Sequence, residues 1–413
     1  MRIVHINSHY DQGGAARIAA CIHRELLREG QESYAAYGRG GDRQEKNVFR
    51  FDGRADIYVS ALLSRVTGLN GYWNRAATRR LLHILDRVRP DILHLHALHG
   101  YYLNLEMLFG YINAHEIPCV WTFHDCHAFT GNCGYFFDCG RWREGCGGCP
   151  RLGGYPASLF LDFTAQMLRH KRELFTAGSK KIIACPSEWL TETAKQSFFG
   201  KYPCRTVRNG IDVRNVFYPR DRDACRAKYG FSPGEKLALG IAAGYKDPRK
   251  GAEYILQTAR DLRGKAKVIL IGWDRKKGAM ASGPDNAVLL PPTESADMLA
   301  EYYSMADVFL LPSLAENYAT STLEAMACGT PVVGFAAGGT PEQLRGKRGI
   351  AVKAGSQEEL TAAVDSVLEG DCGLLQGEEL ARSIREENAA EVMVRQYREL
   401  YRELCCVTVQ TGR

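Results

Sequence analysis

Short apolar runs alternate with helical patterns along the whole chain, and this alternation is the feature that most constrains its fold. Strands and helices in turn are typical of α/β folds with parallel sheets. Helix-period stretches at 15–30 and 251–264 show the pattern between strands in each half. We therefore expect an α/β protein with doubly wound parallel sheets. The expected strands are residues 1–7, 91–97, 119–125 and 180–187 in the first half and 236–244, 267–273, 308–313 and 330–335 in the second.

A chain of 413 residues is too long for one ordinary hydrophobic core, so two domains are expected. We place the first at residues 1–205 and the second at 206–388, because the polar stretch VRNGIDVRNVFYPRDRDA separates the two patterns. The final segment, 389–413, contains a helical pattern that we expect to pack back across both domains.

Composition narrows the class further. With 45% hydrophobic and 24% charged residues the chain resembles a globular protein, and no run of about 18 apolar residues predicts a transmembrane helix. The start, MRIVHINSHYDQGG, lacks the basic and long apolar parts of a signal peptide. We expect a cytoplasmic protein whose 14 cysteines are reduced.

The positive charge is concentrated in the first half. Residues 1–205 contain 26 Lys/Arg and 19 Asp/Glu, a net charge of +7, whereas residues 206–413 contain 27 and 28. Two interpretations of the basic helix remain open: a solvated helix face, or attraction to an anionic membrane surface or a phosphate-bearing acceptor. No known nucleic-acid motif accompanies the charge, so we expect no nucleic-acid partner. The arginines of that helix are Arg75, Arg79, Arg80, Arg87 and Arg89.

Ligands of open α/β sheets bind beyond the carboxyl ends of the strands, so residues after strands are the candidates for function. Gly13 and Gly14 follow the first strand and precede a helix, where backbone N–H groups can bind phosphate. The G-x-G-x-x-G fingerprint is absent there, which disfavours a nicotinamide or flavin enzyme. In the second half Lys246, Arg249 and Lys250 precede a helix, which suits a diphosphate or, alternatively, an exposed basic turn.

Two carboxylates follow the strand at 308–313. Burying a carboxylate is costly unless a partner pairs with it. We expect Glu316 in a loop and Glu324 in the first turns of a helix that begins around Ala319 to Ser321. Carboxylates accept hydrogen bonds from sugar or ribose hydroxyls, so the pair suits a hydroxyl-rich ligand.

Histidines end two strands of the first half. His94 and His96 alternate onto one side of a strand, which allows a metal pair. We favour a polar cleft wall, with His96 and His99 near an acceptor. His124 lies near the end of the strand at 119–125, and it is either a functional residue or a structural histidine.

Five cysteines lie between Cys126 and Cys149, and four of them have the spacing C-x5-C-x6-C-x2-C. Four thiolates suit tetrahedral zinc, so a structural zinc site is the first interpretation. Reduced buried thiols, two disulfides or an iron–sulfur cluster are the alternatives. The four are Cys133, Cys139, Cys146 and Cys149.

The second-half motifs ENYATSTLE, AMACGTPVVGFAAGGTPE, RNGID and RKG, with the amino-terminal GG, resemble the family-4 retaining glycosyltransferases of GT-B fold. The resemblance extends over nearly the whole chain. The first-half segments GGAARIAA, LHLHALHGYYLN and TFHDCHAFTGNCGY are similar to the subgroup that builds bacterial exopolysaccharides, O-antigens and colanic acid, to which the four-cysteine pattern also belongs.

The resemblance implies roles for the candidate residues. Glu324 would bind the ribose of a nucleotide, Glu316 the hydroxyls of the donor sugar, and His124 would lie beside that sugar. The diphosphate would be bound by Lys250, by the N–H groups at Ser321 and Thr322, and by the Gly13–Gly14 loop. The family often has an arginine five residues before the lysine, where this chain has Tyr245; Lys246 or Arg249 would take its place.

The expected function is retaining transfer of a sugar from a UDP- or GDP-sugar to a hydroxyl of a glycan or lipid-linked saccharide, in bacterial surface polysaccharide biosynthesis. Two domains would face each other across a cleft, the first binding the acceptor and the second the donor. No D-x-D motif ends a strand, so no catalytic metal ion or other cofactor is expected. A nucleotide-sugar epimerase of the same architecture and a non-catalytic nucleotide-sugar-binding protein remain alternatives.

Overall fold

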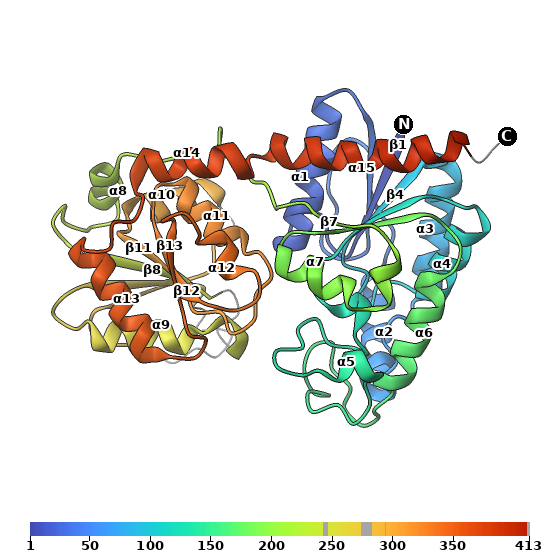
Figure 1. Cartoon of the computed structure of the whole chain (residues 1–413), viewed down its shortest axis with the longest axis horizontal. Coiled ribbons are helices and arrows are strands. Elements are labelled where there is room, and N and C mark those ends of the chain that lie inside the picture. The colour runs from blue at the N-terminus through green and yellow to red at the C-terminus, as the bar shows by residue number, and fades with distance from the viewer. Residues whose placement is uncertain (243–246, 274–282, 294, 411–413) are drawn as a thin grey trace. The chain divides into compact units, whose positions relative to one another are not determined.

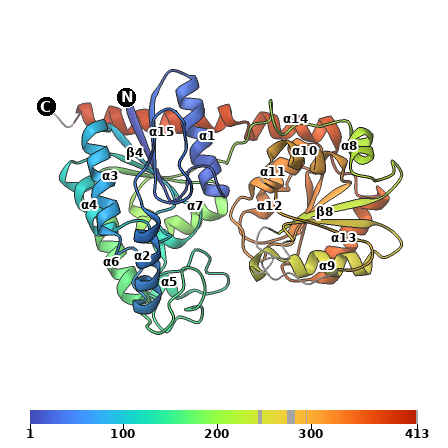
Figure 2. The same cartoon turned by 180° about the vertical axis from the view of Figure 1, so that it is seen from behind.

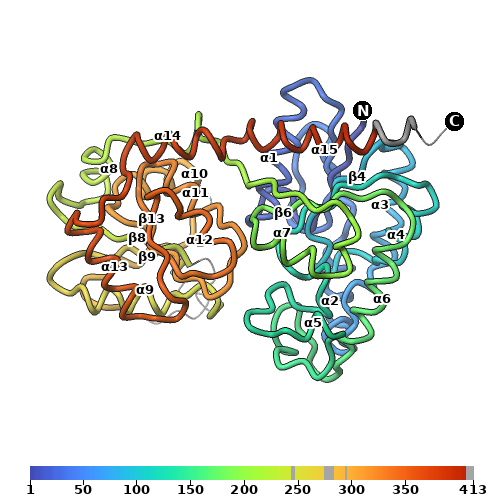
Figure 3. Tube along the Cα trace, in the orientation of Figure 1, coloured from blue at the N-terminus to red at the C-terminus, as the bar shows by residue number. Residues whose placement is uncertain are grey.

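The computed structural model of the chain describes residues 1–242, 247–273, 283–293 and 295–410, with side chains up to Cys405 (Figures 1 and 3). The chain folds into two compact units. Unit 1 comprises residues 1–208 and 393–413, and unit 2 comprises residues 209–392. Each unit is built on one parallel sheet.

The sheet of unit 1 has seven strands in the order β3-β2-β1-β4-β5-β6-β7. Its strands are β1 (Arg2–Asn7), β2 (Glu32–Tyr37), β3 (Val48–Arg50), β4 (Ile92–Leu95), β5 (Cys119–Thr122), β6 (Lys181–Cys185) and β7 (Cys204–Thr206). Its helices are α1 (Gly14–Arg28), α2 (Arg54–Thr67), α3 (Arg75–Val88), α4 (Leu105–Ala114), η1 (His127–Phe129), α5 (Arg141–Glu144), α6 (Thr164–Thr176), α7 (Glu188–Lys195), η2 (Phe198–Lys201) and most of α15 (Ala390–Gln410).

Helices cover both faces of this sheet, which explains why its strands are apolar on both sides. Successive residues of β1 point to opposite faces: Ile3 packs with α1 and α15, and Val4 with α3 and α4. From α15, the Tyr397 hydroxyl is 2.9 Å from Thr122 Oγ1 and the Tyr401 hydroxyl is 2.7 Å from His94 Nδ1. The final helix is therefore part of the core of unit 1 from Met393 onward.

The sheet of unit 2 has six strands in the order β10-β9-β8-β11-β12-β13. One face packs against α9 and α13, and the other against α8, α10, α11 and α14. Its strands are β8 (Leu237–Ile241), β9 (Lys267–Ile271), β10 (Ala287–Leu290), β11 (Val308–Leu311), β12 (Val332–Phe335) and β13 (Gly349–Val352). Its helices are α8 (Arg222–Lys228), η3 (Pro248–Lys250), α9 (Ala252–Asp261), α10 (Ala296–Met305), α11 (Thr320–Ala327), α12 (Thr340–Gln343), α13 (Gln357–Glu369) and α14 (Gly377–Asn388).

The α/β class and all eight expected strands are confirmed. Five further strands were missed: β2, β3, β7, β10 and β13. Four of them end a sheet or are only three residues long, and their partial exposure removes the continuous apolar run that marks a central strand. No helix in the described part of the chain is long and apolar enough to cross a membrane.

Candidate functional site

The basic turn of unit 2 is η3, between β8 and α9. Asp247 caps it: its Oδ1 accepts from the Arg249 backbone N–H at 3.0 Å, and its Oδ2 lies 3.1 Å from Arg249 Nη2. Lys250 ends the turn, and Gly251 follows with φ +69°. Tyr245 and Lys246, the other residues considered for this turn, lie outside the described residues.

Glu316 is paired with this turn. Lys250 Nζ donates to Glu316 Oε2 at 2.6 Å, and Arg249 Nη1 lies 3.7 Å from the same oxygen. Burial alone would raise the pKa of Glu316, but Lys250 and Arg249 together hold it below its usual value. The carboxylate is therefore charged, and Asp247, which is paired with Arg249 at 3.1 Å, balances the second cation. The ion pairs with Lys250 and Arg249 offset the free-energy cost of burying this carboxylate.

Glu324 is buried in α11, which begins at Thr320 as expected. Its Oε2 accepts from the Tyr303 hydroxyl at 3.0 Å. Two residues earlier in α11, the Thr322 hydroxyl is buried and has no hydrogen-bond partner among the described residues. The cap residue Ala319 supplies no side-chain oxygen to the first turn, so the helix start offers N–H groups and hydroxyls to an anion.

The basic turn and the loop that carries Glu316 are held together by backbone contact. The Leu314 N–H donates to the Arg249 carbonyl at 2.8 Å. A Cβ on Gly251 would lie 2.1 Å from the Pro312 carbonyl oxygen, so only glycine fits there. The sequence-predicted residues Arg249, Lys250 and Glu316 are thus brought together in one place.

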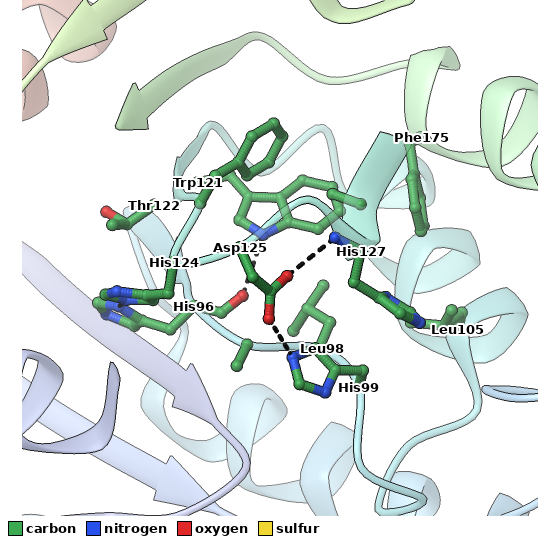
Figure 4. A pocket seen from close by; sticks show the side chains of 13 residues that line it. His96, Leu98, His99, Leu105, Trp121, Thr122, His124, Asp125, His127 and Phe175 are labelled. Atoms are coloured by element: carbon green, nitrogen blue, oxygen red, sulfur yellow. Dashed lines mark hydrogen bonds and ion pairs between the residues drawn. The ribbon is translucent and has the colours of Figure 1, made fainter. Parts of the chain in front are cut away.

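In unit 1 the candidate residues gather where β4 and β5 end. His96, His99 and His124 line a small pocket together with Asp125 and His127 (Figure 4). Gly13 and Gly14 lie at the start of α1, whose first turn has no acidic side chain, and Gly13 has φ +89°.

A chain of imidazole contacts runs from the pocket into the core. His124 Nε2 is 3.1 Å from His96 Nδ1, and His96 Nε2 is 3.2 Å from His5 Nδ1. Burial lowers the pKa of His124 to about 4 and that of His5 and His96 well below the usual value. All three rings are therefore neutral at neutral pH, and each contact joins an N–H to a ring lone pair.

His94 lies on the same side of β4 as His96, but beneath α15 rather than at the pocket. Its two nitrogens contact the hydroxyls of Tyr401 and Thr122, at 2.7 and 2.8 Å. Nitrogens of His5, His94 and His96 lie within 4.8 Å of one another, which is the spacing of a metal site. The hydrogen bonds already made by His94 and His96 favour a buried polar network over a metal pair.

Asp125 is a site residue that the sequence interpretation missed. Its Oδ2 is 2.7 Å from His99 Nε2, and its Oδ1 accepts from the His127 backbone N–H at 2.9 Å (Figure 4). Burial would raise its pKa, but His99 and the hydrogen bonds lower it below the usual value. Its place at the end of the expected strand at 119–125 was the available signal. Tyr303, the partner of Glu324, had none, because it lies inside a helix 21 residues away.

The four expected zinc ligands lie half-buried in the loop around α5. The Gly131 N–H donates a hydrogen bond to Cys146 Sγ at 3.3 Å, and a thiolate can accept the same hydrogen bond. Sulfurs around one zinc ion lie about 4 Å apart, yet within the described residues no three of these sulfurs come within 4.8 Å of one another. No disulfide forms among the thirteen cysteines described. Zinc binding therefore stays a prediction of the spacing, which elemental analysis of the protein tests.

The two-unit architecture is that of the GT-B glycosyltransferases. Sucrose-phosphate synthase from Thermosynechococcus elongatus superposes with a TM-score of 0.72 over 98% of this chain and 99% of its own, at 16% identity. Anabaena HepE in complex with UDP-glucose superposes with a TM-score of 0.69 over 98% and 100%, at 13% identity. At these identities the likeness shows the fold.

Sequence comparison gives the family. The model "Glycosyltransferase Family 4" matches residues 12–215, and "Glycosyl transferases group 1" matches residues 221–390. The chain belongs to the family-4 glycosyltransferases.

Two relatives show how far the sequence similarity extends along the chain. WcaC of Escherichia coli K12, whose name assigns it to colanic acid biosynthesis as a glycosyl transferase, is 26% identical over 98% of this chain and 100% of its own. The D-inositol 3-phosphate glycosyltransferase of Mycobacterium marinum is 29% identical over 54% of this chain and 53% of its own.

We predict that Gly251→Ala destabilises unit 2 by about 2–5 kcal/mol, since the new methyl group adds a clash with Pro312 to the strain of positive φ. Gly264→Ala is the matched control: Gly264 has φ +80° but open space around its Cβ position, so the expected cost is about 1–2 kcal/mol. Urea unfolding followed by circular dichroism measures both. Equal costs would show that the close approach to Pro312 does not matter.

Acid should destabilise unit 1 selectively. All 11 histidines of the chain lie in unit 1, and seven have a lowered pKa, His9, His23 and His124 to about 4. Between about pH 6.5 and pH 4 the unfolded chain binds protons that the folded unit does not, so the free energy of unfolding falls as the pH falls. Each histidine contributes up to about 1.4 kcal/mol per pH unit.

Calorimetry between about pH 7 and pH 5 tests this dependence, with histidine-free unit 2 as the internal reference. His23→Asn keeps a nitrogen for the contact with Ser33 and should reduce the pH slope by about one proton. His83→Asn changes an exposed histidine and should leave the slope unchanged. A slope that neither variant alters would contradict the assignment.

Proposed function

We propose that the protein is a retaining glycosyltransferase that moves a sugar from a UDP- or GDP-sugar to a hydroxyl of a glycan or lipid-linked saccharide. The observation that carries this proposal is the cluster in unit 2, where Lys250 and Arg249 pair with Glu316. A cationic cluster beside carboxylates suits a ligand that carries both a diphosphate and hydroxyl groups. The names of WcaC and of the HepE complex support polysaccharide biosynthesis and a nucleotide-sugar donor.

The donor's leaving group explains the cations. A nucleoside diphosphate gains negative charge as the sugar–phosphate bond breaks, and positive groups in place beforehand stabilise that charge. Lys250, Arg249 and the N–H groups at Ser321 and Thr322 are the groups proposed for this task. An arriving diphosphate would compete with Glu316 for Lys250, which would free a carboxylate oxygen for the hydroxyls of the donor sugar.

Glu324 suits the ribose. Its Oε2 accepts a hydrogen bond from the Tyr303 hydroxyl, and a carboxylate can also accept hydrogen bonds from ribose hydroxyls. The unpartnered hydroxyl of Thr322 lies two residues earlier in the same helix and offers a further partner to the nucleotide.

Unit 1 is proposed to bind the acceptor. The pocket presents the neutral imidazoles of His96 and His124 and one charged carboxylate, Asp125, whose Oδ2 lies 2.7 Å from His99 Nε2. Such groups orient a hydroxyl without attracting a second diphosphate. Retention would follow from attack on the side that the diphosphate leaves, with the leaving phosphate taking the acceptor proton. The role of His124 beside the donor sugar stays a prediction from the family resemblance.

We also propose that the protein works in the cytoplasm, which agrees with the lack of a disulfide among the thirteen described cysteines. The experiment that tests the function is a screen of UDP- and GDP-sugars by thermal shift, followed by slow donor hydrolysis. Binding with hydrolysis supports transfer. Inversion at C2 of the sugar without an acceptor would identify an epimerase, and binding without turnover would identify a binding protein.

The two glutamates should separate binding from turnover. Glu324→Ala is expected to weaken nucleotide binding about tenfold or more, since it removes a charged hydrogen-bond partner of the ribose. Glu316→Ala should mainly lower kcat. Calorimetric titration with UDP and GDP, together with donor hydrolysis rates, measures both effects.

Glu358→Ala is the control, because Glu358 is exposed on α13 and should affect neither quantity. An equal loss of nucleotide affinity for Glu316→Ala and Glu324→Ala would contradict the division of roles.

A further inference from the structure

Exposed large apolar side chains are concentrated at one end of unit 1. Ten such residues are exposed in the described part of the chain, and eight of them belong to α2 or to the segment 155–161. Figure 2 shows α2 at the end of unit 1 opposite α15. We call these eight residues the apolar patch: Tyr58 (76% exposed), Val59 (57%), Leu62 (63%), Val66 (41%), Tyr155 (56%), Leu159 (58%), Phe160 (72%) and Leu161 (46%).

The two parts of the patch form one surface. The Leu159 N–H donates to the Arg65 carbonyl at 2.8 Å, which fastens the segment to the last turns of α2. Gly68, which caps α2 with φ +73°, has room for no side chain because the Leu161 carbonyl oxygen would lie 2.6 Å from its Cβ. The segment is therefore held against α2 with its leucines and phenylalanine in solvent. Clustered exposed apolar side chains mark an interaction surface.

The charges around the patch are positive. Arg54 and Arg65 are exposed on α2, and α3 adds exposed Arg75 and Arg79. Within the described residues, Arg54, Arg75 and Arg79 make no ion pair, whereas the nearby carboxylates are engaged. Asp56 is paired with Arg80 at 2.5 Å, and this contact places the start of α3 beside α2. Asp162 accepts from the backbone N–H groups of Thr164 and Cys149.

The exposed apolar side chains and the surrounding positive charge together indicate which partner binds the apolar patch. A second copy of the chain meeting the same surface across a two-fold axis would bring the arginines against their own copies. An anionic lipid surface instead accepts aromatic and aliphatic side chains at its boundary and attracts the surrounding arginines.

The patch also reaches the pocket of unit 1. The ring of Tyr155 lies 5.9 Å from that of His99, which lines the pocket, and 6.1 Å from that of Tyr101. The Arg65 guanidinium lies 5.9 Å from the same Tyr101 ring. Tyr155 thus belongs to the apolar patch and also contacts a histidine that lines the pocket.

We propose that the apolar patch docks unit 1 on an anionic lipid surface, and that a lipid-linked acceptor reaches the adjoining pocket from that surface. The docking follows from the patch and its charges alone. The second part rests on the proposed function.

Vesicle co-sedimentation of the full chain tests the docking. The protein should bind vesicles of phosphatidylcholine with phosphatidylglycerol, bind phosphatidylcholine alone far less, and lose affinity as salt is added. The double variant Leu62→Ser/Phe160→Ser should bind anionic vesicles at least about tenfold more weakly, because it removes two of the most exposed apolar side chains. Arg54→Ala and Arg79→Ala should each weaken binding about fivefold.

Met298→Ser is the matched control, since Met298 is an exposed apolar residue of unit 2, 38% exposed. It should leave vesicle binding unchanged. Wild-type protein that does not bind anionic vesicles would overturn the proposal. So would a Met298→Ser variant that loses as much vesicle affinity as Leu62→Ser/Phe160→Ser. A dimer in light scattering that Leu62→Ser/Phe160→Ser dissociates would also overturn it, by assigning the patch to a second copy.

Nucleotide binding separates this proposal from the proposed function. Leu62→Ser/Phe160→Ser should keep the thermal unfolding temperature and the UDP- or GDP-sugar affinity of the wild type. Vesicle binding without affinity for any nucleotide sugar would remove the proposed function and leave the docking in place. Nucleotide-sugar turnover without vesicle binding would do the reverse.

Discussion

In both sheets every pair of neighbouring strands runs parallel, so all strands of a unit end at the same edge. Residues within the strands are committed to the hydrogen-bond ladder and to the two helical layers. Residues just after the strands are the ones left to meet a ligand. The basic turn follows β8 and Glu316 follows β11, which is its neighbour in the sheet. The pocket histidines likewise follow β4 and β5, which are also neighbours. Each cluster is therefore a consequence of strand order.

The two clusters solve the problem of buried polar groups in opposite ways. In unit 2, Glu316 stays ionised because two cations, Lys250 and Arg249, face it. In unit 1, burial keeps the imidazoles of His96 and His124 neutral, so they bind one another by hydrogen bonds instead of repelling. The first arrangement favours a diphosphate and the second a hydroxyl. The proposed division into donor and acceptor units follows from this difference.

Central strands and post-strand residues could be predicted from the sequence, because a fully buried parallel strand leaves an apolar run followed by an abrupt polar change. The start of α11 and the positions of Glu316 and Glu324 are examples. Outer strands such as β10 and β13 were missed, since partial exposure weakens that contrast.

Partners that the fold brings from afar could not be predicted. Tyr303 reaches Glu324 from a different helix, and Tyr401 reaches His94 across 307 positions. Alternation correctly placed His94 and His96 on one side of β4, but it could not show that α15 covers His94. Cysteine spacing has the same limit: it states which thiols share a loop, and not whether their sulfurs point to one centre.

The position of the apolar patch bears on which acceptors can reach the proposed acceptor site. If Tyr155 rests at a lipid surface, His99 lies within one ring contact of that surface. A pocket so close to the headgroups can receive a hydroxyl near the lipid end of an acceptor. The far end of a long glycan would extend beyond the pocket. The same geometry favours an acceptor with few sugars over a finished polymer. An enzyme of this kind would act early in the assembly of a lipid-linked chain, where each acceptor is still short.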